Sequence, residues 1–229
     1  MQSVHGSLVA AAILAALAAP AAFAQAPGPT DAVTYIEVTP SGEAETANLL
    51  RQLAAASRKE AGSVAFTVLQ HTERPSQFAI LETWSDAKAR EAHGGSAAMK
   101  QFRGKLDPLR VGYYDERLET GIDVAAPAAP PTKDAIYVVT HVDVAGGVKD
   151  DGIVLMKQLA ADSRKQAGSE RFELWQQNNR LNHFTLVEIW KDRAALDAHA
   201  GAAPSRDFRE KIGHMLGALY DDRRYRSLD

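Results

Sequence analysis

Two stretches of the chain carry the same pattern of apolar and polar residues. They cover residues 78–84 and 184–190, and Trp190 follows Trp84 by 106 positions. Each stretch is largely apolar, apart from one glutamate (Glu82 or Glu188) two positions before the tryptophan. Because alternate residues of a strand point to opposite faces, the pattern predicts a strand that is buried on both sides.

The residues around these stretches predict the same elements twice. For the first copy we expect strand 33–38, helix 43–61, strands 63–70 and 77–84, helical residues 86–93 and 96–103, and strand 111–118. For the second copy we expect strand 139–144, helix 153–167, strands 169–176 and 183–190, helical residues 192–199 and 205–216, and strand 218–224. The order β-α-β-β-α-β is the ferredoxin-like arrangement, with helices on one face of an antiparallel sheet. Its recurrence predicts an internal duplication.

The two predicted repeats span residues 33–119 and 137–226, and residues 120–135 join them. This joining segment is rich in proline and alanine and has no periodicity, which predicts a semi-extended linker. Helices cover only one face of each predicted sheet, although both faces of its strands are apolar. We therefore expect the repeats to pack sheet to sheet, as a monomer that is its own pseudo-dimer. A higher oligomer is the alternative.

The pattern of the N-terminal residues predicts that the protein is exported. Residues 8–19 form an alanine- and leucine-rich run of about a dozen residues, too short to span a bilayer well. A small-x-small pattern ending at Ala24 follows, although no lysine or arginine precedes the run. We predict a cleaved signal peptide over residues 1–24 and a periplasmic or secreted protein without a stable membrane span; an uncleaved anchor is the alternative. Residues 25–32 are expected to be an unpacked leader.

The composition excludes several kinds of site. The net charge is -3 with mixed signs along the chain, which gives no basic footprint for nucleic acid. The absence of cysteine excludes disulfides, thiolate catalysis and iron–sulfur clusters, and it suits an oxidising compartment. The chain also has no His-x-x-x-His pair and no glycine-rich dinucleotide loop, so we expect neither a metal nor a cofactor.

The repeated motif resembles the antibiotic biosynthesis monooxygenase family. The resemblance lies in the strand end Glu82-Thr83-Trp84, followed by Asp86, His93 and Phe102, and it recurs in the second repeat. It implies a dimeric α+β barrel, which two single-domain chains form in the family and which a tandem duplication would form here. It also implies oxygenation without a cofactor. In that chemistry an aromatic small molecule, a phenol or anthrone, is deprotonated and its carbanion reduces O2.

The same residues supply the candidate catalytic groups. His93 and His199 each end a short helix and would handle a proton; the alternative is a helix-terminal histidine bonded to backbone. Glu82 and Glu188 share a strand face with the tryptophans. Each would either orient its histidine or satisfy backbone donors of the helical segment, because a buried carboxylate needs a partner.

Aromatic residues are the candidates for substrate binding. Trp84 and Trp190 would stack on a planar substrate, or they are ordinary core residues. Tyrosines in the predicted last strands would lend a hydroxyl to the site or occupy a solvent-facing edge. The further aromatic candidates are the phenylalanines Phe66, Phe102, Phe172 and Phe208 and the tyrosines Tyr114 and Tyr220.

The repeats are not identical, so we predict two non-equivalent pockets, and either one is a candidate for an inactive site. The second repeat has Trp175, His141 and His183 where the first has Leu69, Tyr35 and Gln77. Haem-degrading relatives use an asparagine on the first strand, which neither repeat offers, so haem degradation is not expected. The predicted function is a cofactor-independent monooxygenase; the alternative is a non-catalytic small-molecule-binding or stress-response module of the same fold.

Overall fold

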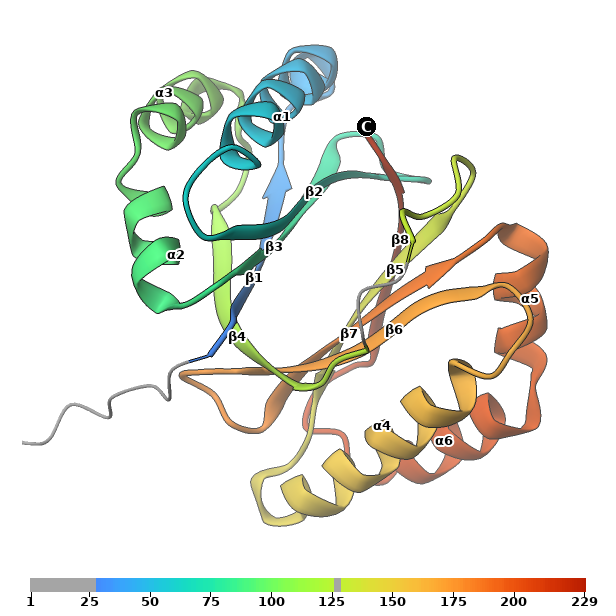
Figure 1. The fold of residues 1–229 in the computed structure, drawn as a ribbon. Helices are drawn as coiled ribbons and strands as arrows, with labels where there is room; N and C mark the ends of the chain where they lie inside the picture. Colours follow the sequence, from blue (N-terminus) through green and yellow to red (C-terminus); the bar gives the residue numbers. More distant parts are fainter. Residues whose placement is uncertain (1–27, 126–128) are drawn as a thin grey trace, which may run out of the picture.

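Eight strands form the centre of the computed structural model, which describes residues 28–125 and 129–229. They are β1 (Thr30–Glu37), β2 (Ser63–His71), β3 (Gln77–Trp84), β4 (Asp115–Asp123), β5 (Ile136–Asp143), β6 (Ser169–Gln177), β7 (His183–Trp190) and β8 (Asp221–Ser227). They close into one barrel in the order β1-β3-β2-β8-β5-β7-β6-β4, and every pairing is antiparallel (Figure 1). The predicted α+β class and the intramolecular barrel built from two repeats are confirmed.

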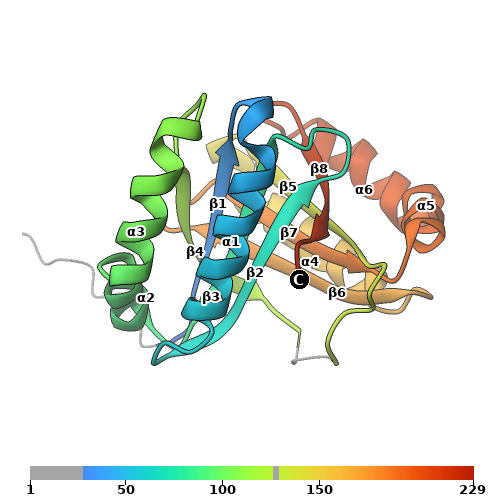
Figure 2. The same cartoon turned by 90° about the horizontal axis from the view of Figure 1, so that it is seen from above.

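Helices cover the barrel on two opposite sides (Figure 1). The first repeat supplies α1 (Glu43–Ser57), α2 (Ala87–Gly94) and α3 (Ala97–Leu106). The second repeat supplies α4 (Lys149–Ser163), α5 (Arg193–Gly201) and α6 (Ala203–Gly213). Figure 2 shows the same two helical layers from above, with the strands between them. Each repeat thus keeps its helices on one face of its own sheet.

The last strand of each repeat joins the two halves of the barrel. β4 pairs with β1 of its own repeat and with β6 of the other, and β8 pairs with β5 and with β2. An unpaired strand edge is a template for aggregation, and a closed barrel has none. Each repeat therefore needs the other to complete its sheet.

Both faces of the strands are buried, as the apolar pattern predicted. In β3, Phe78 and Ile80 point under the helices of the first repeat, whereas Ala79 and Leu81 point into the barrel. A third apolar cluster lies under the helices of the second repeat. Large aromatic side chains occupy much of the barrel interior: Tyr35, Tyr137, Trp175 and Tyr225.

The predicted starts of the last strands are wrong. β4 and β8 begin at Asp115 and Asp221, several residues after the predicted positions 111 and 218. Val111 and Tyr113 are β-branched and aromatic, which is typical of strands, but they lie in the preceding loop with 58% and 93% of their surface exposed. Local composition therefore suggested a strand where the chain makes only isolated backbone contacts, from Arg110 to Val38 and from the N–H of Val111 to the carbonyl of Glu37.

Two segments that were expected to be unpacked contribute to the sheet. β1 begins at Thr30, and Thr30 and Asp31 are buried, so the predicted leader of residues 25–32 ends inside a strand. β4 continues to Asp123, so the predicted linker of residues 120–135 begins inside a strand. Thr120 and Gly121 pair with β6 of the other repeat, a partner that local sequence cannot reveal.

The predicted signal peptide, residues 1–24, lies outside the described residues, so export stays a prediction. In the part of the chain that the structure describes, no helix is long and apolar enough to cross a membrane.

Each repeat makes the same tight turn between its first helix and its second strand. Gly62 and Gly168 have φ angles of +81° and +82°, a region that favours glycine. A Cβ at Gly168 would lie 2.5 Å from the Cβ of Ala195, and one at Gly62 would lie 2.5 Å from the Cβ of Ala89. The turn thus lets the helix that carries the candidate histidine approach the sheet closely.

We predict that Gly168→Ala lowers the free energy of unfolding by about 1–3 kcal/mol, because the new side chain is strained and meets Ala195. Urea denaturation followed by circular dichroism measures the change. Gly104→Ala is the matched control, since nothing lies within 4 Å of a Cβ at this position in α3. The control should be neutral or stabilising by about 0.5–1 kcal/mol. Equal destabilisation by both substitutions would contradict a specific requirement at the turn.

Candidate functional site

A tryptophan and a glutamate form the same buried pair at the end of the third strand of each repeat. Their spacing of two puts both side chains on the helix-facing side. Trp84 Nε1 donates a hydrogen bond of 2.8 Å to Glu82 Oε2, and Trp190 Nε1 donates one of 2.8 Å to Glu188 Oε2. The partner of each buried carboxyl group is therefore the indole N–H, and the backbone donors considered as an alternative do not supply it.

The following short helix places a histidine over the tryptophan. Asp86 begins α2 by accepting a hydrogen bond from the N–H of Ala89, which is a helix N-cap. The ring of His93 stacks on Trp84, with centroids 4.6 Å apart and an interplanar angle of 27°. Asp192 caps α5 in the same way. His199 stacks on Trp190 at 4.4 Å and 25°.

The predicted groups therefore meet in each repeat, on the helical side of the sheet. In each repeat the glutamate, tryptophan and histidine form a cluster. We call Glu82, Trp84 and His93 the first cluster, and Glu188, Trp190 and His199 the second cluster.

In the first repeat the cluster is embedded in ion pairs. Arg90 of α2 is buried, with its Nε 3.0 Å from Glu82 Oε2 and its Nη2 2.8 Å from Glu116 Oε2. Arg103 Nη2 lies 3.1 Å from the same oxygen of Glu116. Burial raises the pKa of Glu82, and the guanidinium of Arg90 opposes the rise. His93 Nδ1 lies 2.9 Å from the carboxylate of Glu60.

In the second repeat two of these positions are uncharged, whereas Asp222 and Arg209 keep the charges of Glu116 and Arg103. Leu196 occupies the position of Arg90, and Gln166 occupies that of Glu60. His199 Nδ1 lies 3.0 Å from Gln166 Oε1, and since an amide oxygen only accepts, this nitrogen carries the proton. Ser205, at the position of Met99, places its Oγ 3.2 Å from the same nitrogen. His199 Nε2 faces Glu188 Oε2 at 3.5 Å.

The acid and the imidazole of the second cluster are both neutral at pH 7. Burial raises the pKa of Glu188 to about 8, although the hydrogen bond from Trp190 opposes the rise. Burial, together with the positive charge of Arg209, lowers the pKa of His199 to about 4. A protonated carboxyl group thus faces the unprotonated Nε2 of the imidazole, and one proton lies between them.

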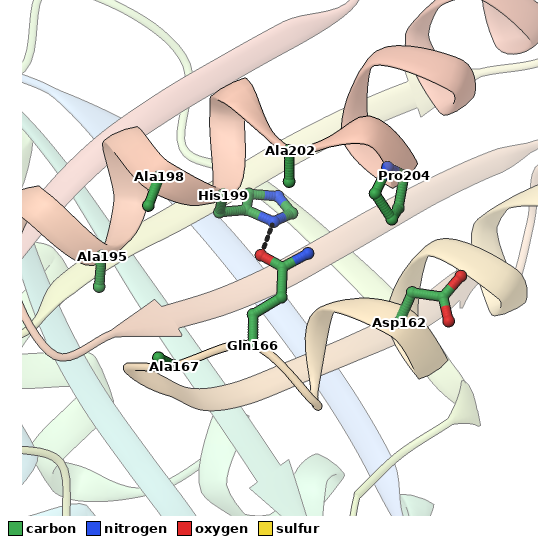
Figure 3. Close-up of a pocket in the computed structure, with 8 residues that line it drawn as sticks. All are labelled: Asp162, Gln166, Ala167, Ala195, Ala198, His199, Ala202 and Pro204. Atoms are coloured by element: carbon green, nitrogen blue, oxygen red, sulfur yellow. Dashed lines mark hydrogen bonds between the residues drawn. The ribbon is translucent and has the colours of Figure 1, made fainter.

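A pocket of about 490 Å³ reaches the second cluster, between the end of α4 and the α5–α6 connection (Figure 3). The side chain of His199 is 8% exposed and lines the pocket, whereas the side chain of His93 is 0% exposed. The other lining residues are mostly small and apolar: Asp162, Gln166, Ala167, Ala195, Ala198, Ala202 and Pro204. A concave, mainly apolar site with few polar groups suits a small organic molecule.

The tryptophans do not line this pocket. Trp84 and Trp190 have no exposed surface, and a histidine ring covers one face of each. In this conformation a ligand meets His199 first, with Trp190 behind it. The expected stacking of a substrate directly on the indole is therefore not available in this conformation.

The phenylalanines divide into two groups. Phe66 and Phe172 meet the histidine rings edge-on, at centroid distances of 5.5 and 6.0 Å from His93 and His199. Phe102 and Phe208 are buried in the apolar clusters beneath the helices. The first pair thus contacts the candidate site and the second pair belongs to the core that supports it.

Tyr114 and Tyr220 lie partly buried beside the clusters and not at a solvent-facing edge. Burial and the nearby Glu82 raise the pKa of Tyr114 to about 12. Burial and the nearby Glu188 raise the pKa of Tyr220 as well. Both hydroxyl groups therefore stay protonated as weak donors near the carboxyl groups. The residue that faces solvent here is Tyr113.

Our reading of the sequence missed the residues that make the two clusters differ. Arg90, Glu60 and Met99 surround the first cluster, and each is replaced by an uncharged or smaller residue in the second repeat. These replacements can be found by aligning the two repeats at the offset of 106 positions. The differences that we singled out lie elsewhere, since Trp175 is in the barrel core and His141 contacts His183 on the barrel-facing side of the sheet.

Within residues 28–125 and 129–229, no group of three or more histidine, aspartate or glutamate side chains is placed to hold a metal ion.

A family model described as "Antibiotic biosynthesis monooxygenase" matches residues 32–105 and 135–211. A Bacillus subtilis protein named "Putative monooxygenase YcnE" is 26% identical over 86 residues, which are 38% of this chain and 90% of that protein. The Synechocystis protein sll1783 is 29% identical over 83 residues, which are 36% of this chain and 56% of that protein. The chain thus spans little more than half the length of this last relative.

Solved structures share the whole fold. A protein from Fusobacterium nucleatum superposes with a TM-score of 0.80 and 16% identity, over 90% of this chain and 94% of its own. A protein named as anthrone oxidase-like superposes with a TM-score of 0.69 and 11% identity, over 88% of this chain and 91% of its own. At these identities the likeness concerns the fold alone.

We predict that Glu188→Gln weakens the pH dependence of stability. The ordinary pKa of a glutamate is 4.5, and that of Glu188 in the folded protein is about 8, so the folded state binds the extra proton between these values. Its contribution to stability is complete below the lower value and is lost as the pH rises through the upper one. The free energy of unfolding of the variant should therefore fall less than that of the wild type between about pH 5 and about pH 9.

Urea unfolding at both pH values measures this difference. Glu119→Gln is a matched control, because burial raises the pKa of Glu119 to about 8 as well and this residue lies on the barrel-facing side of the sheet. It should reduce the pH dependence similarly and leave the pocket unchanged. If Glu188→Gln has the same pH dependence as the wild type, Glu188 is not a neutral acid.

Proposed function

Because the chain belongs to the antibiotic biosynthesis monooxygenase family, we propose that it oxygenates a quinol-like or polycyclic phenolic compound with O2 and without a cofactor. The pocket at His199 supports this proposal most directly. It brings a mainly apolar surface, suited to a flat aromatic molecule, up to the imidazole of His199, and the buried carboxyl group of Glu188 lies 3.5 Å behind that ring.

The small lining residues favour a flat ligand. Ala195, Ala198 and Ala202 leave space that larger side chains would fill, and Pro204 adds an apolar edge. A phenolic hydroxyl at the inner end of the pocket would meet the His199 ring and the amide of Gln166. Such a ligand places its only polar group where the pocket has polar partners.

The second cluster provides an acceptor for the proton of the substrate. Glu188 is mainly protonated at pH 7, and it accepts a proton only in the minor fraction of molecules in which it is ionised; this fraction grows as the pH rises towards its pKa of about 8. A base is most effective when its pKa lies near the working pH. When Glu188 is ionised, the imidazole carries its proton on Nε2, which lies 3.5 Å from Glu188 Oε2. Nε2 gives this proton to Glu188 as Nδ1 takes the proton of the ligand, and this leaves the tautomer whose Nδ1–H faces Gln166. The stacked Trp190 holds the plane of the imidazole during this transfer, and Gln166 Oε1 accepts the hydrogen bond from Nδ1 afterwards.

The deprotonated ligand then reduces O2. For an anthrone-type CH2 group, the carbanion and O2 form a hydroperoxide, which takes up the proton and loses water. The CH2 group becomes C=O, and one O2 yields the carbonyl oxygen and one water. The anthrone oxidase-like protein of the same fold supports the choice of this substrate class.

A second candidate function is binding of the same kind of compound without a reaction, as a ligand-binding or stress-response module. The pKa of His199 favours it, because at about 4 the imidazole alone is a weak base. In that case the neutral acid and imidazole serve only to bind a phenolic hydroxyl.

We predict O2 uptake by the purified protein above the rate of autoxidation, with anthrone or 1,4-naphthalenediol as the substrate. An oxygen electrode measures it. His199→Ala should lower the rate by about 10²–10⁴-fold, the range of general acid–base catalysis. The exposed His214 supplies the control His214→Ala, which should keep the full rate.

Two outcomes would contradict this account. No uptake with any compound of the panel, while these compounds still raise the melting temperature, would favour the binding module. Uptake that is unchanged in His199→Ala would leave the oxygenase but remove the role of the histidine.

A further inference from the structure

The two clusters have the same backbone geometry but different surroundings. In both repeats the tryptophan N–H bonds the glutamate at 2.8 Å, and the histidine stacks on the indole at 4.4–4.6 Å. Gly62 and Gly168 adopt the same left-handed turn beside them. A ligand site at one cluster therefore has a structural counterpart at the other, and the side chains around it decide whether that counterpart is open.

We propose that the first repeat contains a closed copy of the ligand site, which Arg90, Glu60 and Met99 keep shut, so that of the two copies the one at His199 is open. The copy opens when these residues are exchanged for their counterparts in the second repeat. The proposal rests on the proposed function only for the class of ligand that binds.

Arg90 of α2 closes one side of the first cluster through two buried ion pairs. Its guanidinium is buried and lies between Glu82 and Glu116, at 3.0 and 2.8 Å, and Arg103 holds Glu116 from the other side. A ligand that moved Arg90 would leave a buried carboxylate without its partner. Breaking one side of a buried ion pair is strongly destabilising, so a weakly binding ligand does not displace Arg90.

Glu60 closes the first cluster at the outer edge of its histidine. Its carboxylate lies 2.9 Å from His93 Nδ1 and places a negative charge there. Gln166 makes the equivalent contact to His199 with a neutral amide, and it lines the open pocket. A phenol that becomes a phenolate would be repelled at Glu60 but not at Gln166.

Met99 fills space next to the first cluster. Its side chain is fully buried, and its sulfur lies 4.0 Å from the hydroxyl of Tyr114. Ser205 at the equivalent position is shorter and turns a hydroxyl group towards His199. The second repeat thus exchanges a larger apolar side chain for a smaller polar one.

The exchanges at positions 90 and 60 also compensate each other in charge. Arg90 to Leu196 removes one positive charge, and Glu60 to Gln166 removes one negative charge, so the net charge of the site is conserved. Loss of the arginine alone would leave carboxylates unpaired in a buried site. The paired loss leaves uncharged residues at positions 166 and 196 of the second repeat, while Asp222 and Arg209 keep the charges of Glu116 and Arg103.

Chemical modification of the histidines tests whether the copy is closed. Diethyl pyrocarbonate acylates accessible unprotonated imidazoles, and peptide mass spectrometry gives the rate at each histidine. In the wild type we expect His199 to react at least about tenfold faster than His93, with exposed His214 as the internal reference. In Arg90→Leu/Glu60→Gln/Met99→Ser, the rate at His93 should rise at least about tenfold, to that of His199.

The reverse exchange provides a second test in case the first triple variant does not fold. Leu196→Arg/Gln166→Glu/Ser205→Met should protect His199 and leave His93 unchanged. The proposal is overturned if His93 reacts as fast as His199 in the wild type. It is also overturned if both folded triple variants, checked by circular dichroism, keep the wild-type rates.

Ligand stoichiometry separates this proposal from the proposed function. With 1,8-dihydroxyanthraquinone as a redox-inert probe in equilibrium dialysis, the wild type should bind one equivalent and the opened variant two. Ala198→Trp, which fills the pocket of the second repeat, should remove one equivalent from each. If the wild type binds no probe while the modification rates change as expected, the ligand class is wrong and the closed copy stands. Two equivalents in the wild type would overturn the closed copy.

Discussion

A buried glutamate that accepts a hydrogen bond from the tryptophan two residues later is the interaction on which the rest of this site depends. A carboxyl group beneath a helical layer requires a donor, and the indole supplies it within the same strand. The bond fixes the indole plane, and the histidine of the next helix stacks on that plane. The two repeats differ in the group that faces the glutamate and in the charge that the glutamate carries. The first repeat pairs it with Arg90, whereas the second repeat leaves it protonated.

The barrel explains why the two repeats can differ and still remain one structure. β4 and β8 each pair with a strand of the other repeat, so neither half completes its sheet alone. The clusters lie on the outer, helix-facing side of the strands, away from the shared barrel interior. Substitutions around one cluster therefore change one helical layer and leave the cross-repeat pairing intact. Duplication in this arrangement allows one copy to be charged and closed while the other is neutral and open.

Much of this could be predicted from the sequence because the signals are local. The spacing in Glu82-Thr83-Trp84 puts both side chains on one face, and the offset of 106 positions reveals the second copy. The cross-repeat pairing of β4 could not be predicted in this way, because Thr120 and Gly121 meet partners more than 50 positions away. The role of Arg90 was equally hidden. It looks like an ordinary surface arginine of a short helix until the fold brings Glu82 and Glu116 to it.

The protonation state of Glu188 at neutral pH tests the central claim most directly. Infrared spectroscopy resolves the C=O stretch of a protonated carboxyl group from that of a carboxylate, and the difference between wild type and Glu188→Gln isolates this residue. The account predicts a protonated band for Glu188 at pH 7 that disappears as the pH rises through about 8. A carboxylate signal for Glu188 at pH 7 would contradict a neutral second cluster and, with it, the division between the two repeats.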